Sequence, residues 1–300
     1  MLITVASQSR VRAFVALTKP RIIELLLVST VPTMVLAQRG LPDIWLMVAT
    51  VIGGTFSAGG ANAINMYVDR DIDAKMERTK GRPLVTGELQ PTEALVFAVG
   101  LEIISFIWLW GFVNLLSAVL AVTACLFYVF IYTLWLKRTS TQNIVIGGAA
   151  GAAPVLIGWS AVTNQVGWPA VLLFGVVFFW TPPHFWALAI RYESDYAAAG
   201  VPMMPVVAGH KQTAKQMLVY SLVVWACSLA LIPVADMGYV YIASALLIGA
   251  AFSGGAWQLV REQDPAVLNK LSIRYFAFSI THLTVLFGAV ALDQLLGWGT

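Results

Sequence analysis

The chain has 300 residues, of which 59% are hydrophobic and only 11% are charged, and its formal net charge is +3. An average soluble domain has about 25% charged residues, so this composition excludes a water-soluble globule and indicates an integral membrane protein. The small positive charge is explained by loops that face anionic lipid and gives no reason to expect a nucleic acid as partner.

Apolar segments near the length of about 20 residues that crosses a bilayer occur along almost the whole chain. They predict one all-α membrane domain, residues 1–300, folded as a polytopic bundle of about nine transmembrane helices. The predicted helices are 22–38, 45–67, 92–111, 115–136, 143–162, 169–190, 216–235, 239–258 and 275–297. We interpret the basic segment before the first helix as a cytoplasmic leader and not as a transit peptide.

The basic residues alternate between the loops as the positive-inside rule requires. Of the 18 lysines and arginines, all except Arg39 fall in the N-terminal tail or in the loops after the second, fourth, sixth and eighth predicted helices. This pattern places the N-terminus inside and the C-terminus outside. The two longest inner loops, about 68–91 and 191–215, each begin with carboxylates at the end of an apolar helix and are the expected catalytic loops.

Polar side chains recur every fourth residue at the end of the second predicted helix, as Asn65, Asp69 and Asp73. If the helix continues one or two turns beyond the hydrocarbon boundary, they line one face, with Asn62 one turn deeper. Carboxylates stacked in this way repel each other unless a cation lies between them. Carboxylate and amide oxygens are ligands that Mg²⁺ prefers, often together with substrate phosphate. The positive-inside rule alone does not predict such an acidic stripe.

Four basic residues follow this stripe, namely Lys75, Arg78, Lys80 and Arg82. They are placed to supply counter-charge to a diphosphate held on the metal, and arginine side chains match phosphate oxygens in geometry. For Lys75 and Lys80, an ordinary solvated inner loop is an equally good explanation.

The second inner loop carries Glu193 and Asp195 at the end of the sixth predicted helix, and it faces the same compartment as the first. Two acidic helix ends can flank one cavity and hold more than one metal ion around a diphosphate leaving group. The two loops together therefore predict a single metal-dependent site.

The stretches NMYVDRDIDAKMERTKGRPL, residues 65–84, and WTPPHFWALAIRYESDYAAAGVPMMPV, residues 180–206, resemble the haem O synthases, also called protohaem IX farnesyltransferases. This family belongs to the intramembrane aromatic prenyltransferases, and the resemblance covers nearly the whole chain. It implies a helical bundle around a central cavity, in which Mg²⁺ binds farnesyl diphosphate and the farnesyl group is joined to a vinyl group of haem B, giving haem O. It also implies a bacterial inner (plasma) membrane, an active site toward the cytoplasm, and the downstream haem A synthase as a candidate partner.

The resemblance also assigns roles to individual residues. Met66 and Ala199 depart from the superfamily pattern, because many members have an acid at each of these positions; Glu193 is a candidate replacement for the missing carboxylate of the second motif. The expected catalytic residues are Asp69, Asp73 and Asp195; the expected metal ligands are Asn65, Asp69, Asp73, Glu193 and Asp195; and the expected substrate-binding residues are Asn62, Arg78, Lys80, Arg82, His184, Arg191, Tyr192 and Lys211.

His184 follows Pro182 and Pro183 within the sixth predicted helix. An ionisable side chain inside a membrane indicates a functional site. Two interpretations of His184 remain open, namely contact with haem and a hydrogen bond to a neighbouring helix.

Two other functions are compatible with parts of this pattern. A prenyltransferase that acts on a quinone or a chlorophyll precursor differs only in its acceptor. A transporter would place acids near the bilayer midplane and would show two equal halves. The acids of this chain gather at one interface, and nine spans do not divide evenly, so transport is the weaker alternative.

Overall fold

The elements are all helices in the computed structural model, which describes residues 2–297 of the chain; for residues 2–9 and 21–27 it describes the backbone alone. Among the described residues, eight helices are long and apolar enough to cross a membrane. These are α3 (Ile44–Asp73), α5 (Pro91–Phe112), the continuous helix Leu115–Thr139, α8 (Asn143–Thr163), α9 (Trp168–Arg191), α11 (Met204–Val234), α12 (Tyr239–Arg261) and α13 (Pro265–Leu296). The first predicted helix corresponds to α2 (Pro20–Gln38), so every predicted segment forms a long helix.

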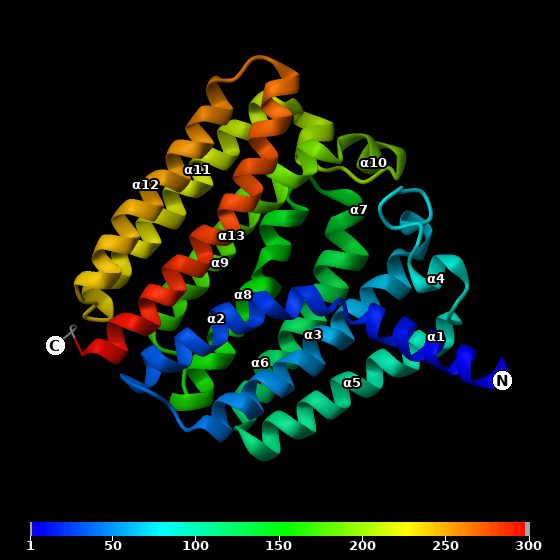
Figure 1. Cartoon of the computed structure of the whole chain (residues 1–300), viewed down its shortest axis with the longest axis horizontal. Helices are drawn as coiled ribbons and strands as arrows, with labels where there is room; N and C mark the ends of the chain where they lie inside the picture. The colour runs from blue at the N-terminus through cyan, green and yellow to red at the C-terminus, as the bar shows by residue number, and fades with distance from the viewer. Residues whose placement is uncertain (1, 298–300) are drawn as a thin grey trace.

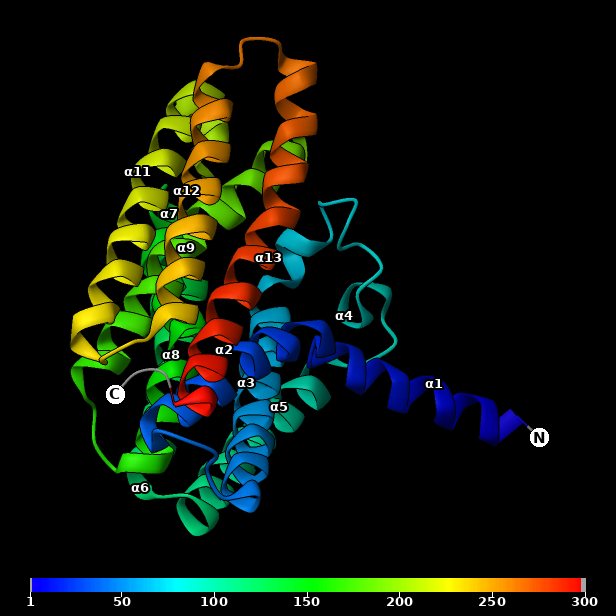
Figure 2. The same ribbon diagram turned by 60° about the vertical axis from the view of Figure 1, so that its left-hand side comes forward.

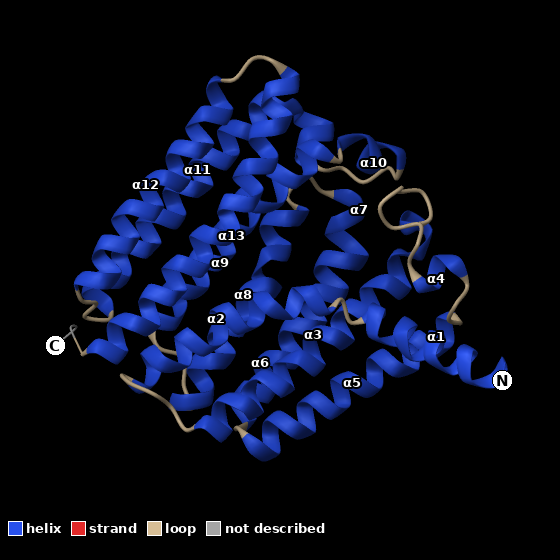
Figure 3. Cartoon of the chain, viewed as in Figure 1, coloured by secondary structure: helices blue, strands red, loops and turns tan. Residues whose placement is uncertain are grey.

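The long helices lie side by side in one bundle, in which α3 packs on α5, and α11 packs on both α9 and α12 (Figure 1; Figure 3). Three short helices, α1 (Leu2–Leu17), α4 (Pro83–Thr86) and α10 (Glu193–Ala198), lie outside it. The helix Leu115–Thr139 changes type along its length, from α6 (Leu115–Leu126) through the π-helix η1 (Phe127–Leu136) to α7 (Lys137–Thr139). The composition and the fold identify a multi-pass integral membrane protein.

Two helices begin earlier than their apolar stretches predict. α11 starts at Met204 and contains a kink at Gly209, whose φ of 75° favours glycine. α13 starts at Pro265, where the Asp264 carboxylate accepts a hydrogen bond from the Ala266 amide and caps the helix. Hydrophobic length detects only the part of a helix that lies in the bilayer, so the predicted loop 191–215 is largely helical.

A half-buried acidic side chain also joins two helices of the bundle. Ser57 of α3 donates a hydrogen bond to Glu102 of α5 at 3.2 Å. Gly60 lies opposite the same side chain, where a Cβ atom would come within 2.6 Å of Glu102 Oε1. Glu102 therefore occupies space that small residues on α3 leave free.

The contact between α2 and α8 depends on a similar close approach. A Cβ atom at Gly158 would lie 2.8 Å from the carbonyl oxygen of Thr30, and a backbone atom cannot move aside without moving its helix. Small residues at such positions allow membrane helices to approach closely.

We expect Gly158→Ala to destabilise the protein by about 1–3 kcal/mol, because the added methyl group forces α2 and α8 apart. The measurement is thermal unfolding in detergent. Gly151→Ala is the matched control on the same helix, since a Cβ atom there meets nothing within 4 Å. Equal stability of the two variants would contradict the close α2–α8 contact.

Candidate active site

The polar stripe of α3 lies on one buried face, as its spacing predicts. Asn62, Asn65, Asp69 and Asp73 are exposed by only 6%, 3%, 0% and 1%, respectively. α3 continues to Asp73 and so keeps all four side chains in helical register. Two carboxylates are thus buried one turn apart, and each requires compensation by a positive charge or by hydrogen bonds.

Asn65 is the centre of a hydrogen-bonded group. Its Nδ2 donates to Asp69 Oδ2 at 2.6 Å and to Thr133 Oγ1 of the π-helix at 3.2 Å. Its Oδ1 accepts from Lys19 Nζ at 3.0 Å. The amide orientation is therefore fixed from three sides, by α3, by η1 and by the turn before α2.

Each buried carboxylate forms a short ion pair through one oxygen, while Asp69 Oδ1 lies 3.8 Å from Arg138 Nη2, beyond hydrogen-bond distance. Asp69 Oδ2 accepts from Lys137 Nζ, and Asp73 Oδ2 accepts from Arg82 Nη1 at 2.5 Å. Asp69 Oδ1 and Asp73 Oδ1 are buried and have no hydrogen-bond partner in the described part of the chain. Buried oxygens without a partner are rare in proteins. Two carboxylate oxygens of this kind, one helical turn apart, fit the donor set of Mg²⁺.

The π-helix η1 brings Lys137 to this face of α3. Thr133 Oγ1 donates to the carbonyl of Tyr128, five residues earlier, at 2.8 Å, which fits the wider turn of a π-helix. π-helical turns often occur at functional sites. The sequence identifies Lys137 only as an inner basic residue, because hydrophobic periodicity does not reveal the change of helix type.

Lys19 is a second basic residue of the site that the sequence motifs miss. It lies in the turn between α1 and α2, with a left-handed backbone (φ 51°) that aims its side chain at Asn65. Burial, together with the nearby cations Arg82 and Lys137, lowers the pKa of Lys19 to about 7. The signal in the sequence is its place at the start of the first membrane helix, directly before Pro20.

Arg78 connects the two predicted catalytic loops. Its Nη2 donates to the Tyr196 hydroxyl at 2.7 Å, and its guanidinium carbon lies 4.9 Å from the centre of the Tyr196 ring and 5.5 Å from that of Tyr192. Figure 1 shows the turn after α3 next to α10. The stretches 68–91 and 191–215 therefore meet at the same end of the bundle as Asp69 and Asp73.

The acids of α10 lie at this end but do not join the α3 carboxylates directly. Glu193 Oε2 accepts from His210 Nε2 at 2.6 Å, and the half-buried Asp195 side chain makes no hydrogen bond within the described chain. Among the side chains that the structure describes, no three from His, Cys, Asp or Glu are spaced to share a metal ion. A second metal site at Glu193 and Asp195 stays a prediction.

The remaining substrate-binding candidates occupy different environments. Lys80 forms an ion pair with Glu77 on the surface, and Arg191 Nη1 donates to Asn269 Oδ1 at 3.5 Å. Lys211 is exposed on α11. None of these three contacts the carboxylates of α3 in the described structure, so their roles as ligands of the substrate stay predictions.

His184 is buried between α9 and α13. Its Nδ1 lies 2.6 Å from Ser279 Oγ, and its ring stacks on Trp180 and Phe276 with centroid distances of 4.2 and 4.5 Å. The hydrogen bond to a neighbouring helix, one of the two alternatives for this histidine, is thus present. Its contact with haem stays a prediction.

Known proteins resemble this chain along nearly its whole length. The model of the UbiA prenyltransferase family matches residues 26–280. A protein of Parafrankia sp. (strain EAN1pec) named protoheme IX farnesyltransferase is 58% identical over 96% of this chain and 91% of its own length. Proteins with the same name from Leifsonia xyli and Streptomyces coelicolor are each 54% identical over 96% of this chain, covering 93% and 92% of their own lengths.

Solved structures share the fold at low sequence identity. A structure from work on digeranylgeranylglyceryl phosphate synthase aligns with a TM-score of 0.78 and 17% identity, covering 96% of this chain and 99% of the other. A UbiA homologue from Archaeoglobus fulgidus, bound to DMAPP and Mg²⁺, aligns with a TM-score of 0.66 and 16% identity, covering 91% and 99%. From the family match and the extent of these similarities, the chain belongs to the UbiA prenyltransferase family.

Proposed function

We propose that this protein transfers the farnesyl group of farnesyl diphosphate to a vinyl group of haem B, giving haem O. Diphosphate is the leaving group, and a water molecule supplies the hydroxyl group of the product and releases a proton. The observation that carries the proposal is the pair of buried carboxylates Asp69 and Asp73, which lie among the basic side chains of Lys19, Arg82 and Lys137. Each carboxylate has one oxygen that makes no hydrogen bond within the described chain. The choice of donor and acceptor is supported by relatives named protoheme IX farnesyltransferase, which are 50–58% identical over 96% of the chain.

Asn65, Asp69 and Asp73 would hold Mg²⁺, with Glu193 and Asp195 proposed for a second ion. The unpartnered oxygens Asp69 Oδ1 and Asp73 Oδ1 are the atoms that fit this role. Bound Mg²⁺ stabilises the negative charge that develops on the departing diphosphate. The Archaeoglobus fulgidus homologue holds the same metal together with a prenyl diphosphate.

The basic side chains would bind the diphosphate oxygens. Two carboxylates alone would repel a diphosphate, so positive charge must lie next to them. Arg82, Lys137 and Lys19 already surround these carboxylates, and Arg78 adds a guanidinium group where the two loops meet. Positive groups fixed in advance stabilise a leaving anion without reorganisation during the reaction.

Aromatic side chains next to Asp69 would face the allylic end of the farnesyl chain. The rings of Tyr128 and Tyr132 stack with centroids 5.3 Å apart on the π-helix. Gly147 makes room for one of them, because a Cβ atom there would lie 2.4 Å from the Tyr132 ring. Aromatic faces attract cations and would stabilise the positive charge that develops when the C–O bond breaks.

The positive-inside pattern supports an active site that faces the cytoplasm from a bacterial inner membrane. The basic loops and the carboxylate stripe of α3 share one end of the bundle. Haem O would then be available to the enzyme that makes haem A, which we propose as a functional partner.

The acceptor is tested by mass spectrometry of haem extracted from cells with and without the gene. We expect haem B to be converted to its farnesyl hydroxyethyl derivative only when the gene is present. Conversion of a quinone or a chlorophyll precursor, with haem B unchanged, would reject the proposed acceptor while leaving the prenyl transfer intact.

The carboxylates of α3 are tested by Asp69→Asn and Asp73→Asn. We expect each to lower turnover at least about 100-fold, because the amide keeps the shape of the side chain but loses the charge that holds the metal. Asp236→Asn is the matched control, since this carboxylate is 73% exposed and pairs with Arg39, which does not contact the stripe. Comparable loss in all three variants would count against the assignment. Thermal unfolding of each variant shows whether it is folded.

The arginines of the first loop are tested by Arg78→Ala and Arg82→Ala. We expect the KM for farnesyl diphosphate to rise about tenfold or more, because each variant removes a charged hydrogen-bond donor. Lys75→Ala serves as the control, because Lys75 is exposed in the same loop. If Lys75→Ala raised the KM as much, the arginines would have only the general role of an inner basic loop.

A further inference from the structure

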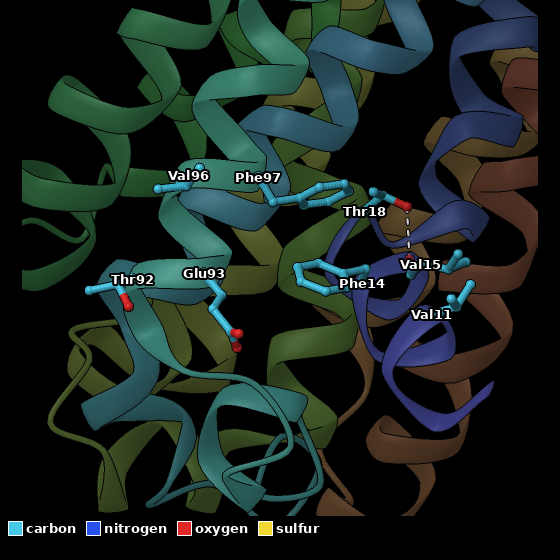
Figure 4. Close-up of a pocket in the computed structure, with 8 residues that line it drawn as sticks. All are labelled: Val11, Phe14, Val15, Thr18, Thr92, Glu93, Val96 and Phe97. Carbon is cyan, nitrogen blue, oxygen red and sulfur yellow. Dashed lines mark hydrogen bonds between the residues drawn. The ribbon is translucent and has the colours of Figure 1, made fainter. Parts of the chain in front are cut away.

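α1 and the beginning of α5 enclose a groove next to the site (Figure 4). Its volume is about 730 Å³, which lies within the range of ordinary ligand sites of about 300–1,000 Å³. Eight described residues line it: Val11, Phe14, Val15, Thr18, Thr92, Glu93, Val96 and Phe97. The groove is therefore mostly apolar, with polar groups at its ends.

The walls of the groove are open to the surroundings of the protein. Val11, Val15 and Val96 are exposed by 62%, 51% and 73%, respectively. At the start of a membrane-spanning helix, such apolar surface is covered by lipid chains and not by water. The side chains around the groove thus offer an apolar site for a hydrocarbon chain.

α1 is attached to the bundle along one side only. Ala13 and Leu17 are 2% and 0% exposed and pack against the α3–α5 pair, while the Phe14 and Phe97 rings lie 5.0 Å apart. Figure 2 shows α1 leaving the bundle sideways, across the direction of the long helices. A helix with one docked apolar side and basic residues beside it is typical of segments that lie in the membrane interface.

The charge next to the groove is positive. Arg10 pairs with Glu93 at the polar end, whereas Arg12 is exposed and has no ion-pair partner among the residues described. No acidic residue precedes Glu24 in the chain. Anionic headgroups attract basic segments at the membrane surface by about 1 kcal/mol for each lysine or arginine, and Arg12 is free to bind one.

We propose that this groove binds one acyl chain of an anionic phospholipid from the inner leaflet, with Arg12 at its headgroup. The apolar walls hold the chain, and the basic residues of α1 select the anionic lipid over a zwitterionic one. The bound lipid then fills the space between α1 and α5 and keeps α1 against the bundle.

The groove shares a residue with the surroundings of the carboxylate stripe. Thr18 lines the groove, and its carbonyl oxygen accepts a hydrogen bond from Asn62 Nδ2 at 3.3 Å. The next residue, Lys19, donates to Asn65. A lipid in the groove therefore contacts Thr18, the residue directly before Lys19, whose side chain orients Asn65. The lipid assignment itself does not depend on the proposed reaction.

The test is native mass spectrometry of the full chain in detergent, with phosphatidylglycerol or phosphatidylcholine added. We expect the chain to retain phosphatidylglycerol. The Val96→Trp variant, in which the larger side chain fills the groove, should weaken this retention about tenfold, because about two methylene groups of the acyl chain lose their burial. Val219→Trp is the matched control, because Val219 is 57% exposed on α11, away from the groove. Arg12→Gln should weaken binding of phosphatidylglycerol but not of phosphatidylcholine.

Three results would overturn the proposal. Equal retention by the Val96→Trp and Val219→Trp variants would show that the groove is not the lipid site. Equal binding of both lipids, unchanged by Arg12→Gln, would show that the groove does not select an anionic headgroup. Displacement of phosphatidylglycerol by farnesyl diphosphate from the unaltered chain, but not from the Val96→Trp variant, would assign the groove to the prenyl chain of the substrate.

Discussion

The burial of Asp69 and Asp73 on one face of α3 is the constraint on which the rest of the site depends. Both carboxylates are almost fully removed from solvent, so each must be balanced by positive charge. Lys137 and Arg82 supply that charge, one from the end of the π-helix and one from the loop after α3. This face of α3 attracts cations strongly, and Asp69 Oδ1 and Asp73 Oδ1 make no hydrogen bond within the described chain. It is therefore suited to bringing a metal ion and a diphosphate together.

The site is assembled from four parts of the chain that lie far apart in the sequence. Asn65 receives Lys19 from the turn before α2 and donates to Thr133 on η1. Arg78, in the loop after α3, donates a hydrogen bond to Tyr196 on α10, so that α10 lies at the same end of the bundle as the α3 carboxylates. A displacement of any of these parts would change the positions of charges around the α3 carboxylates, which makes the site sensitive to the packing of the whole bundle.

α1 extends this dependence toward the membrane surface. α1 leads directly into the turn of Thr18 and Lys19, which contact Asn62 and Asn65. The same segment forms one wall of the apolar groove. The position of the interfacial helix and the geometry of the carboxylate stripe are therefore linked through a short turn, without a long chain of intermediate contacts.

The sequence by itself determined the membrane class, the order of the long helices and the stripe from Asn65 to Asp73, because hydrophobic length and helical spacing are local properties. Only the tertiary structure decided that Lys19 and Lys137 join this stripe, and that His184 bonds Ser279. It also placed Glu193 with His210. These outcomes depend on which helices meet and on the wider turns of η1, and a contact between residues far apart in the chain leaves no periodic signal in one sequence.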